Sequence, residues 1–358
     1  MSRPAFARID LDALRHNYAL ARARHGGRAL AVVKANAYGH GAVRCARALA
    51  PVADGFAVAI VEEAVALREA GITGPILVLE GAFAADDVAL ADRHGLWLVV
   101  HEAQQIDLLA AHTPWQPIPV WLKMDSGMHR AGFFPHEFAS AHARLNALPG
   151  VGPITLMTHF ARADEPGSTA TAAQLAAFDA AVAGLPGDHS LCNSGGILAW
   201  PDAHRQWCRP GIMMYGADPL PEPDPALKAV MTLGSAIIGV RDLAAGEPVG
   251  YGGRFMTERP TRVGLVAMGY ADGYPRTVPD GTPIVVGGRV TRLIGRVSMD
   301  MLTVDLTDLP GVGLGTPVEC WGSLLPVNAV ARAAGTIAYE LLCNVKRVPM
   351  HSVDVSSA

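Results

Sequence analysis

The chain has 358 residues, of which 50% are hydrophobic and 17% are charged, and this balance is typical of a globular protein with two domains. A formal net charge of −4 without a long basic run argues against a nucleic-acid partner. No apolar stretch reaches the roughly 20 residues that span a bilayer, and the first eight residues lack the apolar segment of a signal peptide. The five cysteines are scattered without metal-ligand spacing, so we expect reduced thiols in a cytoplasmic protein with no bound metal.

From residue 29 to about 216, short apolar runs alternate with alanine-rich helical patterns. The strand candidates are residues 29–33, 55–59, 76–79, 96–100, 120–123, 154–159, 189–192 and 208–215. Two of the helical stretches between them, 62–70 and 172–183, end at a glycine, which is a common stop signal. About eight strands alternating with helices over about 200 residues predict a (β/α)8 TIM-like barrel. A doubly wound sheet is the alternative, but no G-x-G-x-x-G motif follows the first strand.

The character of the sequence changes near residue 217. Residues 218–225 alternate prolines with polar residues and read as a linker. Short β-branched runs follow, at residues 235–240, 262–268, 282–286, 289–294, 302–306 and 317–321. A single helix candidate, 326–334, ends at Gly335. We therefore predict an α/β chain with a barrel domain over residues 1–225 and a C-terminal mainly-β domain over residues 226–358.

Lys34 comes directly after the apolar run of the first strand candidate, and a glycine-punctuated turn follows at once, Ala35-Asn36-Ala37-Tyr38-Gly39-His40-Gly41. A lysine at the end of an apolar strand is poorly solvated, and desolvation lowers the pKa of an ammonium group. A neutral amine is what a carbonyl cofactor needs to form a Schiff base. A lone lysine at a strand end is far more often a surface residue, so this interpretation depends on the residues around it.

Polar residues also follow the later strands, where the chemistry of such barrels collects. Lys123 ends the fifth candidate, His159 ends the sixth, Ser194 follows the seventh, and Arg209 lies in the eighth. Each has an ordinary structural interpretation: His159 as a hydrogen-bonded histidine, Ser194 as part of a glycine-rich turn, and Arg209 as a salt bridge at the rim.

Other residues in these loops also allow two interpretations. The hydroxyl of Ser194 and the backbone amides of Gly211 and Ile212 can instead cradle an anion, as phosphate sites do after the last barrel strands. Asp125 and Arg130 can pair with each other on one loop.

Taken together, these motifs resemble those of the alanine racemase family of pyridoxal-phosphate enzymes. The matching segments are residues 34–41, 123–133, 159–164, 193–195, 209–212, 269–274, 296–300 and 338–340. The resemblance runs through essentially the whole chain in a specific order and spacing. It implies interconversion of L-alanine and D-alanine by a homodimer, in which each active site combines the barrel of one chain with the β domain of its partner.

The resemblance also implies roles for individual residues in proton transfer. Pyridoxal phosphate would be held as an aldimine on Lys34. Lys34 and Tyr270 of the partner chain would then act as bases on opposite faces of the substrate. A free tyrosine hydroxyl is a poor base at neutral pH, so its phenolate needs support, which the resemblance assigns to His159 with Arg209 beyond it. Arg209 would also donate to the pyridine nitrogen, because an arginine cannot readily give up its proton.

The remaining roles concern binding. Arg130 would contact the phenolic oxygen of the cofactor and the substrate carboxylate, and Lys123, which is often carbamylated in this family, would steady it. The backbone amide of Met299 would help to bind the substrate carboxylate. The phosphate would be held by Tyr38, Ser194, Gly211, Ile212 and Tyr339. Tyr339 and Met299 would also leave little room beyond a methyl group, which favours alanine, although serine is hard to exclude by size.

Four alternatives stay open at this stage. A pyridoxal-dependent decarboxylase on the same plan would need a carboxylate near the pyridine nitrogen, where this chain has Arg209. A pyridoxal-phosphate carrier would not need Tyr270 or a second domain. A metal-dependent hydrolase would need clustered histidines, which the first strand end lacks. A racemase of broader specificity is the nearest competitor. The sequence also does not decide between supply of D-alanine for peptidoglycan and catabolism of alanine.

Overall fold

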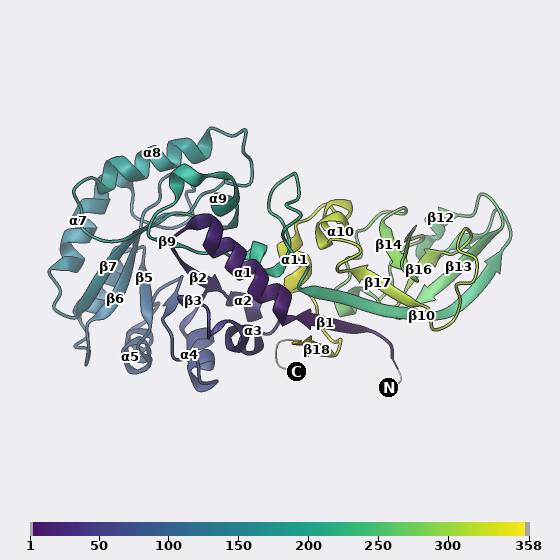
Figure 1. The fold of residues 1–358 in the computed structure, drawn as a ribbon, viewed down its shortest axis with the longest axis horizontal. Helices are drawn as coiled ribbons and strands as arrows, with labels where there is room; N and C mark the ends of the chain where they lie inside the picture. The colour runs from purple at the N-terminus through teal and green to yellow at the C-terminus, as the bar shows by residue number, and fades with distance from the viewer. Residues whose placement is uncertain (1–2, 355–358) are drawn as a thin grey trace.

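The structure, a computed structural model, describes residues 3–354. The molecule is elongated, with a barrel of strands and helices at one end and a mainly-β part at the other (Figure 1). Helix α11, Ala338–Cys343, lies where the two parts meet (Figure 1). None of the helices within residues 3–354 combines the length and the hydropathy needed to cross a membrane.

The first part is a closed barrel of eight parallel strands, which confirms the predicted fold class. In order around the barrel the strands are β2 (Arg28–Val32), β3 (Gly55–Val58), β4 (Ile76–Val78), β5 (Trp97–Val100), β6 (Ile118–Lys123), β7 (Val151–Met157), β8 (His189–Ser190) and β9 (Trp207–Cys208). The surrounding helices are α1 (Leu11–His25), α3 (Ala42–Leu49), α4 (Val61–Glu69), α5 (Ala85–His94), α6 (Ala103–Ala110), α7 (Pro135–Asn146) and α8 (Ala170–Val182). Because all the strands are parallel, their carboxyl ends meet at one mouth.

The last two barrel strands are shorter than the sequence predicts. The seventh candidate, 189–192, forms a strand only at His189–Ser190. The eighth candidate, 208–215, is wrong over most of its length, since β9 ends at Cys208 and residues Ile212–Tyr215 form a 3-10 helix, η2. Pro210 explains this difference, because a proline has no N–H to donate to a neighbouring strand.

The second part is built on an eight-stranded sheet in which the long strand β10, Met231–Leu243, pairs with three neighbours. Its other strands are β1 (Phe6–Asp10), β13 (Thr261–Val266), β14 (Pro283–Val286), β15 (Arg289–Arg292), β16 (Leu302–Asp305), β17 (Pro317–Trp321) and β18 (Met350–Val353). A separate pair is formed by β11 (Pro248–Val249) and β12 (Phe255–Met256). The six strand runs predicted here all form strands, and α10, Val327–Ala334, ends at Gly335 as predicted. Gly335 has a left-handed φ of 69°.

Strand β1 was not predicted, and it joins the beginning of the chain to the second part. It runs antiparallel to β10 and parallel to β18, although the barrel follows directly after it in sequence. The proline-rich segment 218–225, which the sequence predicts as a linker, contains no helix or strand. Asp218 accepts backbone hydrogen bonds from Leu220 (2.8 Å) and Asp224 (2.6 Å) within it.

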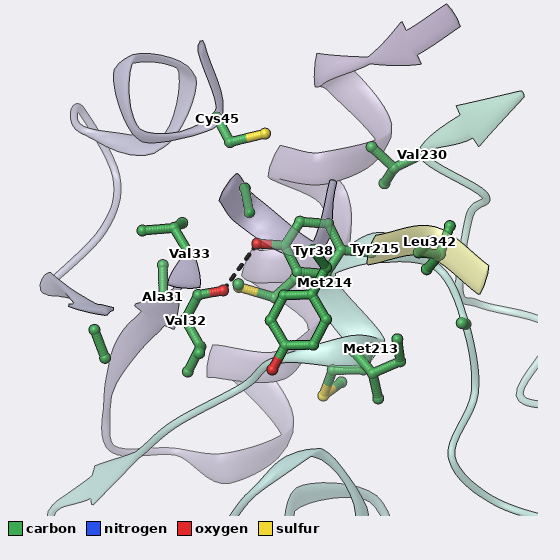
Figure 2. Close-up of a cluster of buried hydrophobic side chains, with 14 of the residues drawn as sticks. Ala31, Val32, Val33, Tyr38, Cys45, Met213, Met214, Tyr215, Val230 and Leu342 are labelled. Carbon is green, nitrogen blue, oxygen red and sulfur yellow. Dashed lines mark hydrogen bonds between the residues drawn. The ribbon is translucent and has the colours of Figure 1, made fainter. Parts of the chain in front are cut away.

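One hydrophobic cluster continues from the barrel into the second part. Figure 2 shows the region where β2, η2 and α11 converge, with Tyr38, Tyr215 and Leu342 among the packed side chains. The hydroxyl of Tyr215 donates to the carbonyl of Val32 at 2.8 Å, so the end of β2 is tied to η2 (Figure 2). This packing fixes the backbone immediately before Lys34.

Candidate active site

A cavity of about 660 Å³ lies at the mouth of the barrel, at the carboxyl ends of its strands. Ten of the twelve residues that the sequence predicts for the site line it: Lys34, Tyr38, Lys123, Arg130, His159, Ser194, Arg209, Gly211, Ile212 and Tyr339. The other two, Tyr270 and Met299, lie on the second part and are not among its lining residues.

The segment after Lys34 has an unusual backbone. Lys34 begins the short helix α2, Lys34–Tyr38, and Ala35, Asn36, Ala37 and Tyr38 all have φ between 51° and 55°. This left-handed turn contains no glycine, and each such residue costs about 1–2 kcal/mol. Strained backbone of this kind persists only where the surroundings hold it firmly, and it is concentrated at functional sites.

Two side chains hold this turn. Both oxygens of Glu63, on α4, accept backbone hydrogen bonds, one from Ala35 at 2.7 Å and the other from Ala59 at 2.8 Å. Inside the turn, Nδ1 of the buried His40 lies 2.9 Å from the carbonyl oxygens of both Ala37 and Tyr38, so this nitrogen carries the proton and donates. The sequence did not predict either role, because a glutamate in the first turn of a helix is an ordinary capping residue.

The cavity is rich in basic groups and contains one lining carboxylate, Glu80, among the described residues. Burial, together with the charge of Arg130, lowers the pKa of Lys34. Burial and the charges of Arg130 and Arg209 lower the pKa of Lys123 to about 8. Burial and the neighbouring Arg209 also lower the pKa of His159 well below its usual value, so this imidazole is neutral at physiological pH. Such an environment favours an anionic ligand and an amine that loses its proton readily.

Arg209 is buried without a carboxylate partner among residues 3–354. Its Nη1 donates to the carbonyl (2.9 Å) and the hydroxyl (2.5 Å) of Ser190, and its Nη2 donates to the carbonyl of Thr158 at 2.7 Å. The alternative of a salt bridge at the rim is therefore wrong. Burial lowers the pKa of Arg209 to about 10, which still leaves the guanidinium charged at neutral pH.

Hydroxyls and backbone amides form a cradle on one side of the cavity. The hydroxyl of Ser194, at the start of α9 (Ser194–Ala199), accepts from the amides of Gly211 (3.0 Å) and Met213 (3.3 Å). The amide of Ile212 has no hydrogen-bond acceptor within residues 3–354. A Cβ added at Gly211 would lie 2.7 Å from the hydroxyl of Tyr38, so glycine keeps this space open. Amides, a serine and a tyrosine without a lysine suit a phosphate group.

The loop after β6 leaves Arg130 free to face a ligand. Asp125 accepts the amides of Gly127, Met128 and His129 at 2.9–3.0 Å, and it lies 3.4 Å from the His129 ring. Arg130 has no ion pair within the described part of the chain. The alternative in which Asp125 pairs with Arg130 is therefore wrong, and the guanidinium that lines the cavity has unused donors.

Tyr270 and Met299 lie side by side on the second part. Tyr270 begins a short 3-10 turn, η4 (Tyr270–Asp272), whose amides at Tyr270 and Ala271 donate to the carbonyls of Ser298 (3.1 Å) and Met299 (3.0 Å). Both side chains are exposed, by 39% for Tyr270 and 52% for Met299. A tyrosine and a methionine exposed together are available to another molecule.

Several cavity residues have no role in the sequence prediction. Glu80 and Phe83 follow β4, His101 follows β5, and Cys343 ends α11. Phe83 is 62% exposed at the rim. A position just after a strand was the only available signal for the first three, and it does not distinguish them from ordinary loop residues.

Comparisons with known proteins agree on one family. A family model described as "Alanine racemase, N-terminal domain" matches residues 9–219, and one described as "Alanine racemase, C-terminal domain" matches residues 230–352. An alanine racemase of Azoarcus sp. (strain BH72) is 65% identical, with 97% of this chain and 98% of that protein covered.

Solved structures give the same result. The biosynthetic alanine racemase of Pseudomonas aeruginosa superposes with a TM-score of 0.96 at 50% identity, over 98% of this chain and 100% of the other. The alanine racemase of Bartonella henselae, whose crystal structure contains covalently bound pyridoxal phosphate, has a TM-score of 0.89 at 31% identity, over 98% and 99% of the two chains.

Proposed function

The chain belongs to the alanine racemase family, and we propose that it interconverts L-alanine and D-alanine with pyridoxal phosphate bound around Lys34. The family consists of pyridoxal-phosphate-dependent isomerases, and a solved relative carries this cofactor covalently bound. The observation that carries the proposal is the convergence of ten predicted site residues on one basic cavity at the mouth of the barrel.

The cavity fits the cofactor by charge and by its pattern of donors. The cradle of Ser194, Gly211 and Ile212 would hold the phosphate, with the hydroxyls of Tyr38 and Tyr339 beside it. The rings of these two tyrosines are 5.9 Å apart. The bound cofactor supplies an electron-accepting ring that stabilises negative charge at Cα of the amino acid.

The charged side chain of Arg209 favours racemisation over other reactions of this cofactor. Carbonyl and hydroxyl oxygens of the protein accept hydrogen bonds from its Nη atoms and fix the orientation of the guanidinium. Because a guanidinium keeps its proton, Arg209 would donate a hydrogen bond to the ring nitrogen and would favour an unprotonated ring that withdraws electrons less strongly. A short-lived negative charge at Cα suits proton return and disfavours transamination. A decarboxylase of the same plan would place a carboxylate here.

Two side chains would move the Cα proton. The lowered pKa of Lys34 makes its amine available to bind the cofactor and to take a proton on one face. On the other face we assign Tyr270 from a second copy of the chain, because Tyr270 is exposed and does not line the cavity of its own chain. The neutral His159 would support the tyrosine hydroxyl. Each base takes the proton in one direction and returns it in the other.

The substrate carboxylate would be bound from both chains. Arg130, free of ion pairs within residues 3–354, offers a forked guanidinium that matches a carboxylate. The amide of Met299 from the second copy would complete the contact. We assign Lys123 to steadying Arg130, and its low pKa of about 8 makes its amine reactive enough for carbamylation. Tyr339 and Met299 would leave room for little more than a methyl group.

Three further features belong to this proposal. The active unit is a homodimer, because each site would be incomplete without the second chain. The location is the cytoplasm, in line with the five free cysteines among residues 3–354. The chain divides near residue 225 into a barrel domain, 1–225, and a β domain, 226–358, with strand β1 of the first segment pairing into the sheet of the second.

Two measurements test the proposal. Borohydride reduction of the purified yellow protein, followed by peptide mapping, should place the cofactor label on Lys34, and label on another lysine would refute the assignment. Racemisation assays with alanine, serine and larger amino acids should show a clear preference for alanine. Equal rates with serine and alanine would instead support the racemase of broader specificity.

A further inference from the structure

The side chain that the proposed function assigns to a second chain is partly exposed in its own chain. Tyr270 is 39% exposed, so its position depends on the backbone turn that carries it. A base that acts on another subunit must be placed to within a fraction of an ångström, since a misplacement of about 1 Å can cost about 10²-fold in rate. The turn therefore needs firm anchors within its own chain.

Asp272, two residues after Tyr270, supplies such an anchor. Its side chain is fully buried, and its carboxylate accepts hydrogen bonds from three groups. Arg3 donates through both Nη atoms, at 2.8 and 2.6 Å, Arg347 donates at 3.1 Å, and the amide of Gly269 donates at 2.9 Å. Burial alone would raise the pKa of Asp272, but these bonds outweigh it and lower the pKa, so the carboxylate stays ionised.

The turn is also clamped between two backbone segments. A Cβ at Gly269 would lie 2.2 Å from the carbonyl oxygen of Met299, and one at Gly273, where φ is +110°, would lie 2.4 Å from that of Asn344. The amide of Lys346 donates to the carbonyl of Asp272 at 2.9 Å. The turn thus has the Met299 loop on one side and the segment after α11 on the other.

The same two arginines connect these segments. Arg3 also donates to the carbonyl of Asp300 at 3.0 Å, and Arg347 donates to the Asp300 carboxylate at 2.5 Å. Arg347 has a left-handed φ of 57°, which is uncommon for a residue other than glycine and indicates that this contact is enforced. One network therefore reaches the Tyr270 turn, the Met299 loop and the segment that follows Tyr339.

We propose that Asp272, held by Arg3 and Arg347, is a positioning residue that presents Tyr270 and the Met299 amide to the active site of the second chain. The inference rests on the proposed function and deepens it. Arg3 is far in sequence from the residues that line the cavity. The inference gives it a part in positioning Tyr270 at the neighbouring site. It also explains why the turn combines one buried carboxylate with two close-packed glycines.

The test compares Asp272→Asn with Asp305→Asn in the homodimer with pyridoxal phosphate bound. Asp305 is the matched control, since it is also a buried aspartate of the β part, 7% exposed, with an arginine partner, Arg292, at 2.9 Å. Asparagine keeps the shape but removes the charge and one acceptor. We expect racemisation by Asp272→Asn to fall about 10²-fold, the amount that misplacement causes, while Asp305→Asn stays within about threefold of the unchanged protein.

A second measurement separates positioning from general damage. The overall racemisation rates in the two directions are linked, because the enantiomers have equal free energies. Exchange of the Cα proton for deuterium in D₂O is not linked in this way. Each base removes the Cα proton from one enantiomer and can return a deuteron to the same face, so the two exchange rates can change independently. Asp272→Asn should lose exchange of the enantiomer served by Tyr270 and keep exchange of the other within about threefold. Equal loss for both enantiomers, or a loss no larger than that of Asp305→Asn, would overturn the inference.

Arg3→Ala keeps the test decisive if Asp272→Asn does not fold. It removes the two bonds from Arg3 and leaves those from Arg347 and Gly269, and Arg8→Ala on strand β1 is its control. We expect about tenfold slower racemisation with the same enantiomer-selective loss of exchange; unchanged kinetics would contradict the inference. Tyr270→Phe, measured in parallel, tests the underlying function. If Tyr270→Phe loses exchange of one enantiomer and both network variants do not, only the positioning role fails. If Tyr270→Phe loses neither selectively, the proposed function fails and the inference fails with it.

Discussion

Replacing the buried His40 by asparagine should remove a source of acid sensitivity from the turn that follows Lys34. His40 is fully buried, its Nδ1 donates to two carbonyl oxygens of the turn, and its Nε2 has no hydrogen-bond partner within residues 3–354. A proton added to Nε2 would be a buried charge without a partner. The side-chain amide of asparagine can replace the Nδ1 donor, and it does not titrate.

The size of the effect follows from the pKa. Burial lowers the pKa of His40 to about 4, whereas a histidine in an unfolded chain titrates near 6.5. As the pH falls below about 6.5, the unfolded chain binds a proton that the folded chain does not bind until about pH 4, so the folded state loses stability across this window. One pKa unit corresponds to about 1.4 kcal/mol, so lowering the pH from 7.5 to 5 costs about 2 kcal/mol at this residue.

The assay is urea unfolding of the protein with pyridoxal phosphate bound, at pH 7.5 and pH 5. It compares the wild-type chain with His40→Asn and His351→Asn. His351 is exposed and serves as the matched control. The free energy of unfolding should fall between the two pH values by about 2 kcal/mol less in His40→Asn than in the unchanged chain. His351→Asn should behave like the unchanged chain. A parallel fall in all three proteins would refute the argument that His40 is held neutral by burial.

Two further substitutions test the cradle and the turn. Gly211→Ala places a Cβ 2.7 Å from the Tyr38 hydroxyl, so the Kd for pyridoxal phosphate should rise about 10- to 100-fold in a fluorescence titration, whereas Gly74→Ala, with no atom within 4 Å of the new Cβ, should not change it. A normal Kd for Gly211→Ala would rule out a phosphate site here. Glu63→Ala leaves two amides without their acceptor, so kcat should fall about tenfold while KM changes little. Glu62→Ala, one position away and exposed, is the control. Equal kinetics for the two variants would argue against the claim that Glu63 holds the turn after Lys34.

The barrel and the Lys34 position could be predicted because their signals are local. An apolar run that ends in a lysine, repeated alternation of strand and helix patterns, and glycines after helices all lie within a few residues of each other. The eighth strand was predicted too long because an apolar run does not distinguish a strand from the 3-10 helix Ile212–Tyr215. Strand β1 was missed since its five residues carry little pattern of their own.

The supports of the site could not be predicted, because they depend on contacts between distant segments. The left-handed turn from Ala35 to Tyr38 contains no glycine, which is the usual sign of positive φ. Arg3 and Asp272 are separated by 269 positions, and neither the charge nor the spacing of Arg3 indicates a partner. The assignment of Tyr270 to the site depends on the family resemblance, since within one chain this residue lies outside the cavity.

The most direct test of the central claim, that Lys34 and Tyr270 of two chains form one site, is the activity of hybrid dimers. Lys34→Ala and Tyr270→Ala chains should each be inactive alone. When they are mixed in equal amounts and allowed to reassociate, about half of the dimers are hybrids, each with one intact site, so activity should return to about one quarter of the unchanged level. No recovery in a mixture shown to contain hybrid dimers would contradict the shared active site.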